Sequence, residues 1–370
     1  MTIGIIGLGA MGLGIAQVFA QAGRTVLAAD AEPATRASAA ARLAQSLAPR
    51  VAKGAMTEAE REAILGRLQV VERVEDLAPA DLVIEAVVER LAVKQAVFAA
   101  LEPLLSADAV LGTNTSSLSV AAIAGGLERP ERLLGLHFFN PAPAMRLVEL
   151  IPHPGTAPDA LARARSLTEG AGKTVIQCAD RPGFIVNRCA RPYYGEALAL
   201  LEEGRTAGAI DAAMMAAGYP IGPFALIDLI GADINLAATK SLAAAMGDHP
   251  RYHVFAALKA QVAQGNLGRK SGRGFVFPKP SAPTPADAQA IVLRIEATLA
   301  NEAAWLFAEG GSMADGIDTA LRLGLNFPRG PFAMLESHGR DAVLATLAAL
   351  ETAAPPDLKG RYLPAPDLTR

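Results

Sequence analysis

Short apolar runs alternate with amphipathic segments along the first half of the chain. The apolar runs occupy residues 3–6, 25–29, 82–86, 110–113 and 133–137. The segments 11–22 and 90–105 repeat apolar residues with helical spacing, and Thr57 and Glu60 form a capping box that predicts another helix through Leu68. Strands that alternate with such helices are typical of a mostly parallel, doubly wound sheet. The pattern therefore predicts an α/β domain of the Rossmann type over residues 1–181.

From Pro182 onward the pattern is helical almost throughout, beginning with residues 184–203. This half contains an internal repeat, in which three segments recur in the same order: 196–204 as 302–310, 210–211 as 317–318, and 220–224 as 328–332. A proline-rich stretch, residues 278–285, lies between the copies and has the composition of a stiff linker. We therefore expect two tandem helical domains, residues 182–280 and 281–370, with a boundary near residue 280.

Composition excludes several classes of function. Hydrophobic residues make up 51% of the chain and charged residues 19%, which suits well-buried globular domains, and the net charge of −3 lacks the basic footprint of a nucleic-acid-binding protein. Cys178 and Cys189 are too few for a disulfide framework and wrongly spaced for zinc. No apolar run approaches the roughly 20 residues of a membrane span, and the first predicted strand leaves no room for a leader. We expect a soluble, cytoplasmic protein without a metal site.

A glycine-rich loop connects the first predicted strand to the helix that follows. Its sequence is Gly7-Leu8-Gly9-Ala10-Met11-Gly12. Gly7 allows a tight turn, Gly9 lets a pyrophosphate approach the backbone, and Gly12 permits close packing of the helix on the strand. The N–H groups and the dipole at the start of that helix favour phosphate groups. Together with its flanking strand and helix, the loop predicts a dinucleotide site.

Asp30 ends the second predicted strand, about 20 residues beyond the loop, where dinucleotide-binding domains carry an acidic residue. A carboxylate at this position accepts hydrogen bonds from the ribose hydroxyls and repels a 2′-phosphate. The residues that follow, Ala31 and Glu32, are not basic. We therefore expect NAD and not NADP as the cofactor.

Polar residues gather at the ends of two further predicted strands, where the ligands of open α/β sheets bind. Residues 113–118 include Ser116, and residues 137–141 begin with His137. Oxidation of a secondary alcohol needs a base for the hydroxyl proton, and histidine titrates near neutrality. A carboxylate such as Glu149 can hold the second ring nitrogen. His137 is therefore a candidate general base.

Ser116 and Asn187 are candidates to form hydrogen bonds with the reacting oxygen or with a thioester carbonyl. The residues alone leave structural roles open for this whole group. His137 has the alternative of a structural hydrogen-bonding role, and Glu149 that of a solvated strand residue. Residues 114–117 have the alternative of capping the helix that follows them.

In these segments the chain resembles the 3-hydroxyacyl-CoA dehydrogenase family. The matching stretches are residues 7–16, 81–94, 113–118, 137–150, 180–187, 218–224 and 268–275. The most specific are His137-Phe-Phe-Asn-Pro141 and Gly268-Arg-Lys-Ser-Gly-Arg-Gly-Phe275, because a glycine loop alone occurs in many proteins. The resemblance implies NAD-dependent oxidation of an L-3-hydroxyacyl-CoA thioester to the 3-ketoacyl thioester, and the reverse reaction.

The resemblance also implies roles for individual residues. His137 corresponds to the general base and Glu149 to its electrostatic partner, while Ser116 and Asn187 correspond to residues that bind the substrate oxygen. The positions that match contacts to NAD are Glu89, Lys94, Ser116, Asn140 and Lys270.

Two positions on the long helix after Asp30, Ser46 and Lys53, match contacts to CoA. Pro49 is expected to kink this helix. Solvated helix charges are the alternative for Lys94 and Lys53, and an ordinary turn position is the alternative for Lys270.

The resemblance gives the internal repeat a meaning. In the simplest members of the family the helical domain occurs once and pairs two subunits, whereas larger relatives carry tandem copies. Here Leu293 occupies the repeat position of Asn187, and residues 268–275 have no counterpart after the second copy. We therefore expect a degenerate, structural second copy, and either a monomer with an internal pseudo-dimer or a homodimer.

Two other functions remain as alternatives. One is a dehydrogenase of a small 3-hydroxy acid without CoA, of the hydroxyisobutyrate or gulonate type. The other is a non-catalytic scaffold that binds NAD, against which the presence of the four candidate catalytic residues argues. The expected partner is an acyl-CoA thioester, with no nucleic acid and no membrane.

Overall fold

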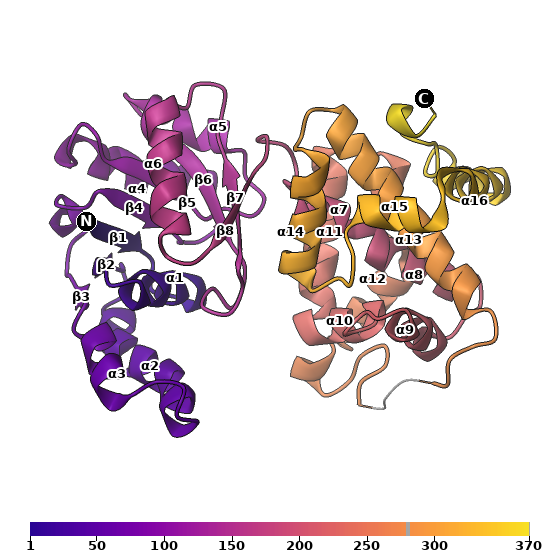
Figure 1. Ribbon diagram of the computed structural model, residues 1–370, viewed down its shortest axis with the longest axis horizontal. Helices are drawn as coiled ribbons and strands as arrows, with labels where there is room; N and C mark the ends of the chain where they lie inside the picture. The colour runs from indigo at the N-terminus through magenta and orange to yellow at the C-terminus, as the bar shows by residue number, and fades with distance from the viewer. Residues whose placement is uncertain (279–281, 370) are drawn as a thin grey trace. The chain divides into compact units, whose positions relative to one another are not determined.

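The computed structural model describes residues 1–278 and 282–369. The chain divides into two compact units, Met1–Arg181 and Pro182–Arg370 (Figure 1). The first unit combines a sheet with helices, and the second is built from helices. The boundary that the sequence predicts near residue 280 lies outside the described residues.

The first unit, every residue of which the structure describes, is organised around an eight-stranded sheet with the strand order β3-β2-β1-β4-β5-β6-β7-β8. The strands are β1 (Thr2–Ile6), β2 (Thr25–Ala29), β3 (Leu68–Val70), β4 (Leu82–Glu85), β5 (Val110–Thr113), β6 (Leu133–Phe138), β7 (Leu147–Ile151) and β8 (Thr174–Gln177). Neighbouring strands are parallel except β6 and β7, which are antiparallel. The sheet is thus mostly parallel, as the alternating pattern predicts.

The helices of the first unit pack on the sheet with their apolar sides. They are α1 (Ala10–Gln21), α2 (Pro33–Ala52), α3 (Glu58–Leu65), α4 (Leu91–Leu101), α5 (Val120–Ala124) and α6 (Pro158–Glu169). Side chains of α1, α2 and α6 join those of the sheet in one buried cluster, in which Ile5, Phe19 and Leu136 are fully buried. Figure 1 shows α6 lying across the strands, where it packs against β5 and β8. This packing leaves the strand ends and their loops available for polar residues.

The third strand corrects the predicted helix through Leu68. The capping box is present, because the Thr57 hydroxyl accepts from the Glu60 N–H at 3.1 Å and the Glu60 carboxylate accepts from the Thr57 N–H at 2.7 Å. The helix nevertheless ends at Leu65, and Leu68 begins β3, pairing with Val26 of β2. The prediction extended the helix too far because the local spacing of apolar residues does not show that a segment pairs with a strand distant in sequence.

Helices make up the second unit, and α13 contacts most of the others. In chain order they are α7 (Val186–Cys189), α8 (Arg191–Glu202), α9 (Ala207–Ala216), α10 (Pro223–Ile230), α11 (Ala232–Ala245), α12 (Ala256–Ala263), α13 (Ala288–Ala308), α14 (Ala314–Leu325), α15 (Pro331–His338) and α16 (Arg340–Ala353). α13 packs against α7, α8 and α9 from the first half of the unit and against α14, α15 and α16 from the second. Both halves of the unit therefore share one central helix.

The helix predicted over residues 184–203 is wrong as a single element. It is divided at Ala190 into α7 and α8. Pro192 stands in the first turn of α8, where its missing N–H does no harm. In an unbroken helix the same proline would lose a hydrogen bond and clash with the carbonyl of Arg188.

Neither a membrane-spanning helix nor a metal-binding cluster is found in the described part of the chain. No helix within residues 1–278 and 282–369 is long and apolar enough to cross a membrane. The same residues contain no group of three or more His, Cys, Asp or Glu side chains that could hold a metal ion.

Candidate active site and dinucleotide loop

The glycine loop follows β1 directly and begins α1. Gly7 has a φ of +92°, and a Cβ there would lie 2.6 Å from the Ala86 carbonyl oxygen. A Cβ on Gly12 would lie 1.7 Å from the Gly7 carbonyl oxygen, so the helix start can sit this close only with glycine. A Cβ on Gly9, by contrast, would meet no described heavy atom within 4 Å. Gly9 therefore leaves room beside the start of α1, where backbone N–H groups attract an anion.

Asp30 holds this loop from the end of β2. Its carboxylate accepts hydrogen bonds from the Leu8 N–H at 2.6 Å and from the Glu32 N–H at 2.8 Å. Arg36 lies beside it, since its Nη1 donates to the Asp30 backbone carbonyl at 2.6 Å. Sequence reasoning considered only Ala31 and Glu32 and missed this guanidinium, which the first turn of α2 brings back to the strand end.

β6 and β7 bring His137 and Glu149 together. The two residues stand directly opposite each other in the antiparallel pair, with His137 Nδ1 2.6 Å from Glu149 Oε2. Glu149 is 0% exposed, so the alternative of a solvated residue is wrong. Because an ionised carboxylate can only accept, this hydrogen bond places the ring proton on Nδ1. A neutral ring then has its lone pair on Nε2, as a base requires.

Glu89 organises the loop that follows β5. Its Oε1 accepts hydrogen bonds from the Thr115 hydroxyl at 2.6 Å and from the Ser116 N–H at 3.0 Å. Burial opposes ionisation of Glu89, but the Thr115 hydrogen bond and the charge of Lys94 outweigh it and lower its pKa. Ser116 is thus held at the end of β5, the strand next to the one that carries His137.

Lys94 is buried, which corrects the alternative of a solvated helix charge. It is 1% exposed, and its Nζ pairs with Glu85 Oε1 at 2.6 Å and with Glu89 Oε2 at 3.1 Å. Glu85 is itself 0% exposed and also accepts from the Thr113 hydroxyl at 2.7 Å. Sequence reasoning missed Glu85 and Thr113 as members of this site. The available signal was a carboxylate that ends an otherwise apolar strand.

Residues 114–117 do not cap the next helix. The cap of α5 is Ser119, and the Asp180 carboxylate accepts two further N–H groups of its first turn. Asn114 instead accepts from the Phe138 N–H at 2.8 Å and ties the end of β5 to β6. Asn140 lies exposed just beyond β6.

Two of the predicted site residues belong to the second unit. Asn187 is half-buried on α7, and its backbone carbonyl accepts from Arg191 Nε at 2.9 Å. Lys270 lies in a short 3₁₀ turn and pairs with Asp233 at 2.6 Å. The hydrogen bond from Lys270 lowers the pKa of Asp233. Their contacts with cofactor or substrate stay predictions.

A cavity of about 670 Å³ lies within the first unit. Its walls come from the end of α1, the α2–α3 pair and the segments 143–146 and 170–173, and the cationic side chains among them are Arg50, Arg67, Arg146 and Lys173. Lys173 also fixes one wall, because its Nζ donates to the carbonyls of Ala142 and Met145 at 2.6 and 2.8 Å. Burial lowers the pKa of Lys173. This concentration of positive charge suits an anionic ligand.

Ser46 and Lys53, the predicted CoA contacts, lie on either side of Arg50 along the chain. The Ser46 hydroxyl donates to the Gln17 side chain at 2.7 Å, and Lys53 is exposed at the C-cap of α2. The helix does not end at Pro49 but continues to Ala52. Their contact with CoA stays a prediction.

Family models match nearly the whole chain. The NAD-binding domain of 3-hydroxyacyl-CoA dehydrogenase matches residues 2–181, and the C-terminal domain of that enzyme matches residues 183–277 and 291–368. The 3-hydroxyadipyl-CoA dehydrogenase of Escherichia coli is 46% identical over 277 residues, which are 74% of this chain and 58% of that protein. A 3-hydroxybutyryl-CoA dehydrogenase of Mycobacterium tuberculosis is 41% identical over 278 residues, or 74% of this chain and 96% of the relative.

A solved structure is similar over the full length. The crystal structure of 3-hydroxybutyryl-CoA dehydrogenase from Escherichia coli matches with a TM-score of 0.92 and 33% sequence identity, covering 100% of this chain and 97% of that one. The agreement extends across both units, and the glycine loop with Asp30 lies in the part that the NAD-binding model matches. The chain therefore belongs to the 3-hydroxyacyl-CoA dehydrogenase family of oxidoreductases, and its first unit is the NAD-binding domain of that family.

Proposed function

We propose that the chain oxidises an L-3-hydroxyacyl-CoA thioester to the 3-ketoacyl thioester and also catalyses the reverse reaction. The observation that carries this proposal is the buried pair of His137 and Glu149, 2.6 Å apart, on β6 and β7. The relatives are named for 3-hydroxyacyl-CoA substrates, which favours a CoA thioester over a free hydroxy acid.

In this proposal His137 is the general base. Nε2 takes the proton of the substrate's 3-hydroxyl group, while Nδ1–H stays bonded to Glu149. The charge that develops on the ring is then stabilised by a carboxylate that water does not screen. When bound, NAD accepts the hydride that leaves C3, the carbon that carries this hydroxyl group. In the reverse direction the imidazolium returns its proton to the oxygen.

The residues of the first unit fit NAD. We assign the pyrophosphate to residues 7–12, with Leu8 in the loop and the N–H groups of Ala10 and Met11 as donors, and the adenosine ribose to Asp30. The support is the space left at Gly9 and the tight approach that Gly7 and Gly12 permit. The other residues that we assign to NAD are Glu89, Lys94, Ser116, Asn140 and Lys270.

We assign the substrate's reacting oxygen to Ser116 and Asn187, and its CoA moiety to Ser46 and Lys53. The basic cavity supports the assignment of CoA to this region, because Arg50 lines it and lies between Ser46 and Lys53 along the chain. CoA carries several phosphates, and guanidinium groups bind phosphate with two hydrogen bonds each.

We further propose that the helical unit consists of two copies, residues 182–280 and 281–370, which form an internal pseudo-dimer. The proposal is supported by the two ranges that the family's C-terminal model matches, residues 183–277 and 291–368. Asp211 accepts from the N–H groups of Phe224 and Ala225, and Asp318 accepts in the same way from those of Phe332 and Ala333. Because Leu293 stands at the position of Asn187, we assign the substrate role to the first copy alone.

The test is oxidation of NADH by acetoacetyl-CoA, with free acetoacetate and NADPH as controls. We expect turnover with the thioester and NADH and little with either control. Comparable kcat/KM values for free acetoacetate would favour a small hydroxy acid as substrate. Binding of NADH without turnover of any acyl-CoA of short, medium or dicarboxylic type would favour a non-catalytic scaffold.

A further inference from the structure

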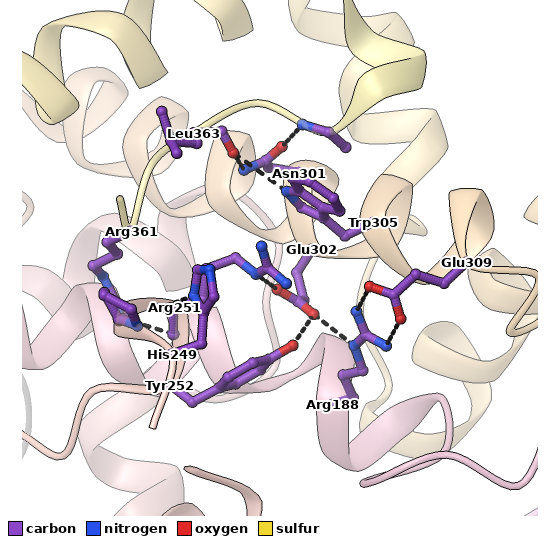
Figure 2. A network of polar contacts seen from close by, with 12 residues as sticks. Arg188, His249, Arg251, Tyr252, Asn301, Glu302, Trp305, Glu309, Arg361 and Leu363 are labelled. Carbon is purple, nitrogen blue, oxygen red and sulfur yellow. Dashed lines mark hydrogen bonds and ion pairs between the residues drawn. The ribbon is translucent and has the colours of Figure 1, made fainter. Parts of the chain in front are cut away.

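Arg188, the residue after Asn187 on α7, is buried against acidic groups of α13 (Figure 2). Its Nε donates to Glu302 at 2.6 Å, and its two terminal nitrogens donate to Glu309 at 2.7 and 2.9 Å. Arg188 is 0% exposed. The two acids lie 114 and 121 residues further along the chain, at the end of α13. The second copy thus holds the guanidinium beside the proposed substrate residue.

Glu302 receives further donors from the first copy. The Tyr252 hydroxyl donates to it at 2.5 Å, and Arg251 Nε lies 3.1 Å away, as Figure 2 shows. Burial alone would lower the pKa of Arg188, but the hydrogen bond to Glu309 and the charge of Glu302 raise it well above its usual value. Arg188 therefore stays charged, and it can stay buried only while its two acids hold it.

α7 is too short to fix its own orientation. It spans Val186–Cys189, and an isolated helix of one turn is not stable in water. α7 packs against α13 and α14, both of which belong to the second copy. Side chains one residue apart point about 100° apart around a helix axis, so fixing the Arg188 side chain fixes the direction of the Asn187 side chain.

We propose that Arg188 is a positioning residue, and that Glu302 and Glu309 of the second copy act on the reaction by fixing it and so aiming the Asn187 amide. The inference rests on the proposed function, in which Asn187 binds the reacting oxygen. The inference gives the second copy a part in turnover, although that copy carries Leu293 in place of the asparagine.

The same arrangement occurs a second time and supplies a matched control. Arg294 donates from Nε to Glu196 at 3.1 Å and from its terminal nitrogens to Glu203 at 2.6 and 2.7 Å. Arg361 and Tyr362 also donate to Glu196, while on the other side Tyr252 donates to Glu302 and Arg251 forms an ion pair with it. The residue before Arg294 is Leu293, which has no polar group for substrate.

The experiment compares Glu309→Gln with Glu203→Gln in the full chain. Each acid forms a two-point pair with an arginine that is buried (Arg188) or 12% exposed (Arg294), and each acid is itself partly or largely exposed, so both variants are expected to fold. Glu309→Gln is expected to lower kcat/KM for acetoacetyl-CoA about tenfold, because small displacements of a substrate-orienting group are costly. Glu203→Gln is expected to change it less than twofold, and neither is expected to change the Kd for NADH.

A double-mutant cycle with Asn187→Ala separates positioning from general loosening. If Glu309 acts through Asn187, Glu309→Gln has less than a twofold effect on kcat/KM in the Asn187→Ala background. An undiminished tenfold effect in that background, or equal effects of Glu309→Gln and Glu203→Gln, would overturn the inference. Should Asn187→Ala leave kcat/KM unchanged, the substrate role of Asn187 fails and the inference with it. If the unmodified chain turned over no acyl-CoA thioester at all, the proposed function itself would be overturned.

Discussion

The second unit holds two ion clusters that are alike in composition and differ in their neighbours. The Glu302 cluster contains Glu302 and Glu309 with Arg188, Arg251 and Tyr252. The Glu196 cluster contains Glu196 and Glu203 with Arg294, Arg361 and Tyr362. In each, an acid in one half of the unit receives donors from the other half. The first cluster stands beside Asn187 and the second beside Leu293.

This difference separates the residues that serve packing from those that we assign to a site. Two helical halves that bury a shared face need the same charges to be paired on both sides, so the acids and arginines occur twice. Under the proposed function a polar group for substrate is needed on one side only, which accounts for Asn187 on one side and Leu293 on the other. The Lys270 turn, with its ion pair to Asp233, likewise belongs to the first copy.

The largest expected effect comes from a residue outside both clusters and sets the scale for variants within them. His137→Gln removes the proposed base and should lower kcat by about 10²–10⁴. The Kd for NADH and the melting temperature should change little, since His137 is bonded to Glu149 and not to the glycine loop. Steady-state kinetics with acetoacetyl-CoA measure the loss. A loss below tenfold would remove His137 from that role.

Removing the central acid of either cluster should destabilise the protein to the same extent. Glu302→Ala and Glu196→Ala each remove the buried carboxylate that lies between two arginines and a tyrosine, which costs about 3–5 kcal/mol of unfolding free energy. Urea denaturation of both variants measures this loss. If the two values differed by more than about 2 kcal/mol, the clusters would not be equivalent in packing.

One substitution gives the two clusters the same neighbouring residue, the one that precedes Arg188 and Arg294. Asn187→Leu copies the Leu293 arrangement into the first copy and should lower kcat/KM about 10²-fold through loss of substrate orientation. Its reverse counterpart, Leu293→Asn, should leave kcat/KM within twofold. Equal kinetic effects of the two substitutions would contradict the assignment of the site to one copy.

The smallest expected effect concerns Asp211 and Asp318, whose carboxylates accept from backbone N–H groups at the starts of α10 and α15. Burial raises the pKa of Asp211 to about 6, with a contribution from the charge of Asp228, while its two backbone hydrogen bonds oppose the rise. A folded pKa above the unfolded value near 3.9 favours the protonated form on folding. The contribution of Asp211 to stability is therefore complete below about pH 4 and is lost as the pH rises through about 6.

Asp211→Asn should remove this dependence, so that the variant gains on the order of 2 kcal/mol relative to the parent between pH 4 and pH 7. Asp318→Asn should give a smaller gain in the same direction, because burial also raises the pKa of Asp318, which is only half-buried. Urea unfolding at both pH values measures the two differences. If the free energy of unfolding of the parent and of Asp211→Asn changed by the same amount between the two pH values, Asp211 would not titrate in this range.

Much of the first unit could be predicted from local spacing. β2 and β5 have the bounds of the apolar runs at 25–29 and 110–113, because these strands are buried and bounded by polar or glycine-rich segments. β3, β7 and β8 lie outside the predicted runs. β3 has only three residues, none fully buried, and its existence depends on the free edge of β2.

The dinucleotide loop, Asp30 and the position of His137 at a strand end could be predicted from the amino-acid sequence alone. These features depend on neighbours in the chain, and backbone geometry ties them to a few residue types. That Glu149 faces His137 depends on the folded sheet, since strand register places together residues that are twelve apart in sequence. The burial of Lys94 on Glu85 and the contacts that hold Arg188 on α13 likewise depend on the tertiary structure. A buried charge is stable only with its partner, and that partner is supplied by packing that local spacing does not encode.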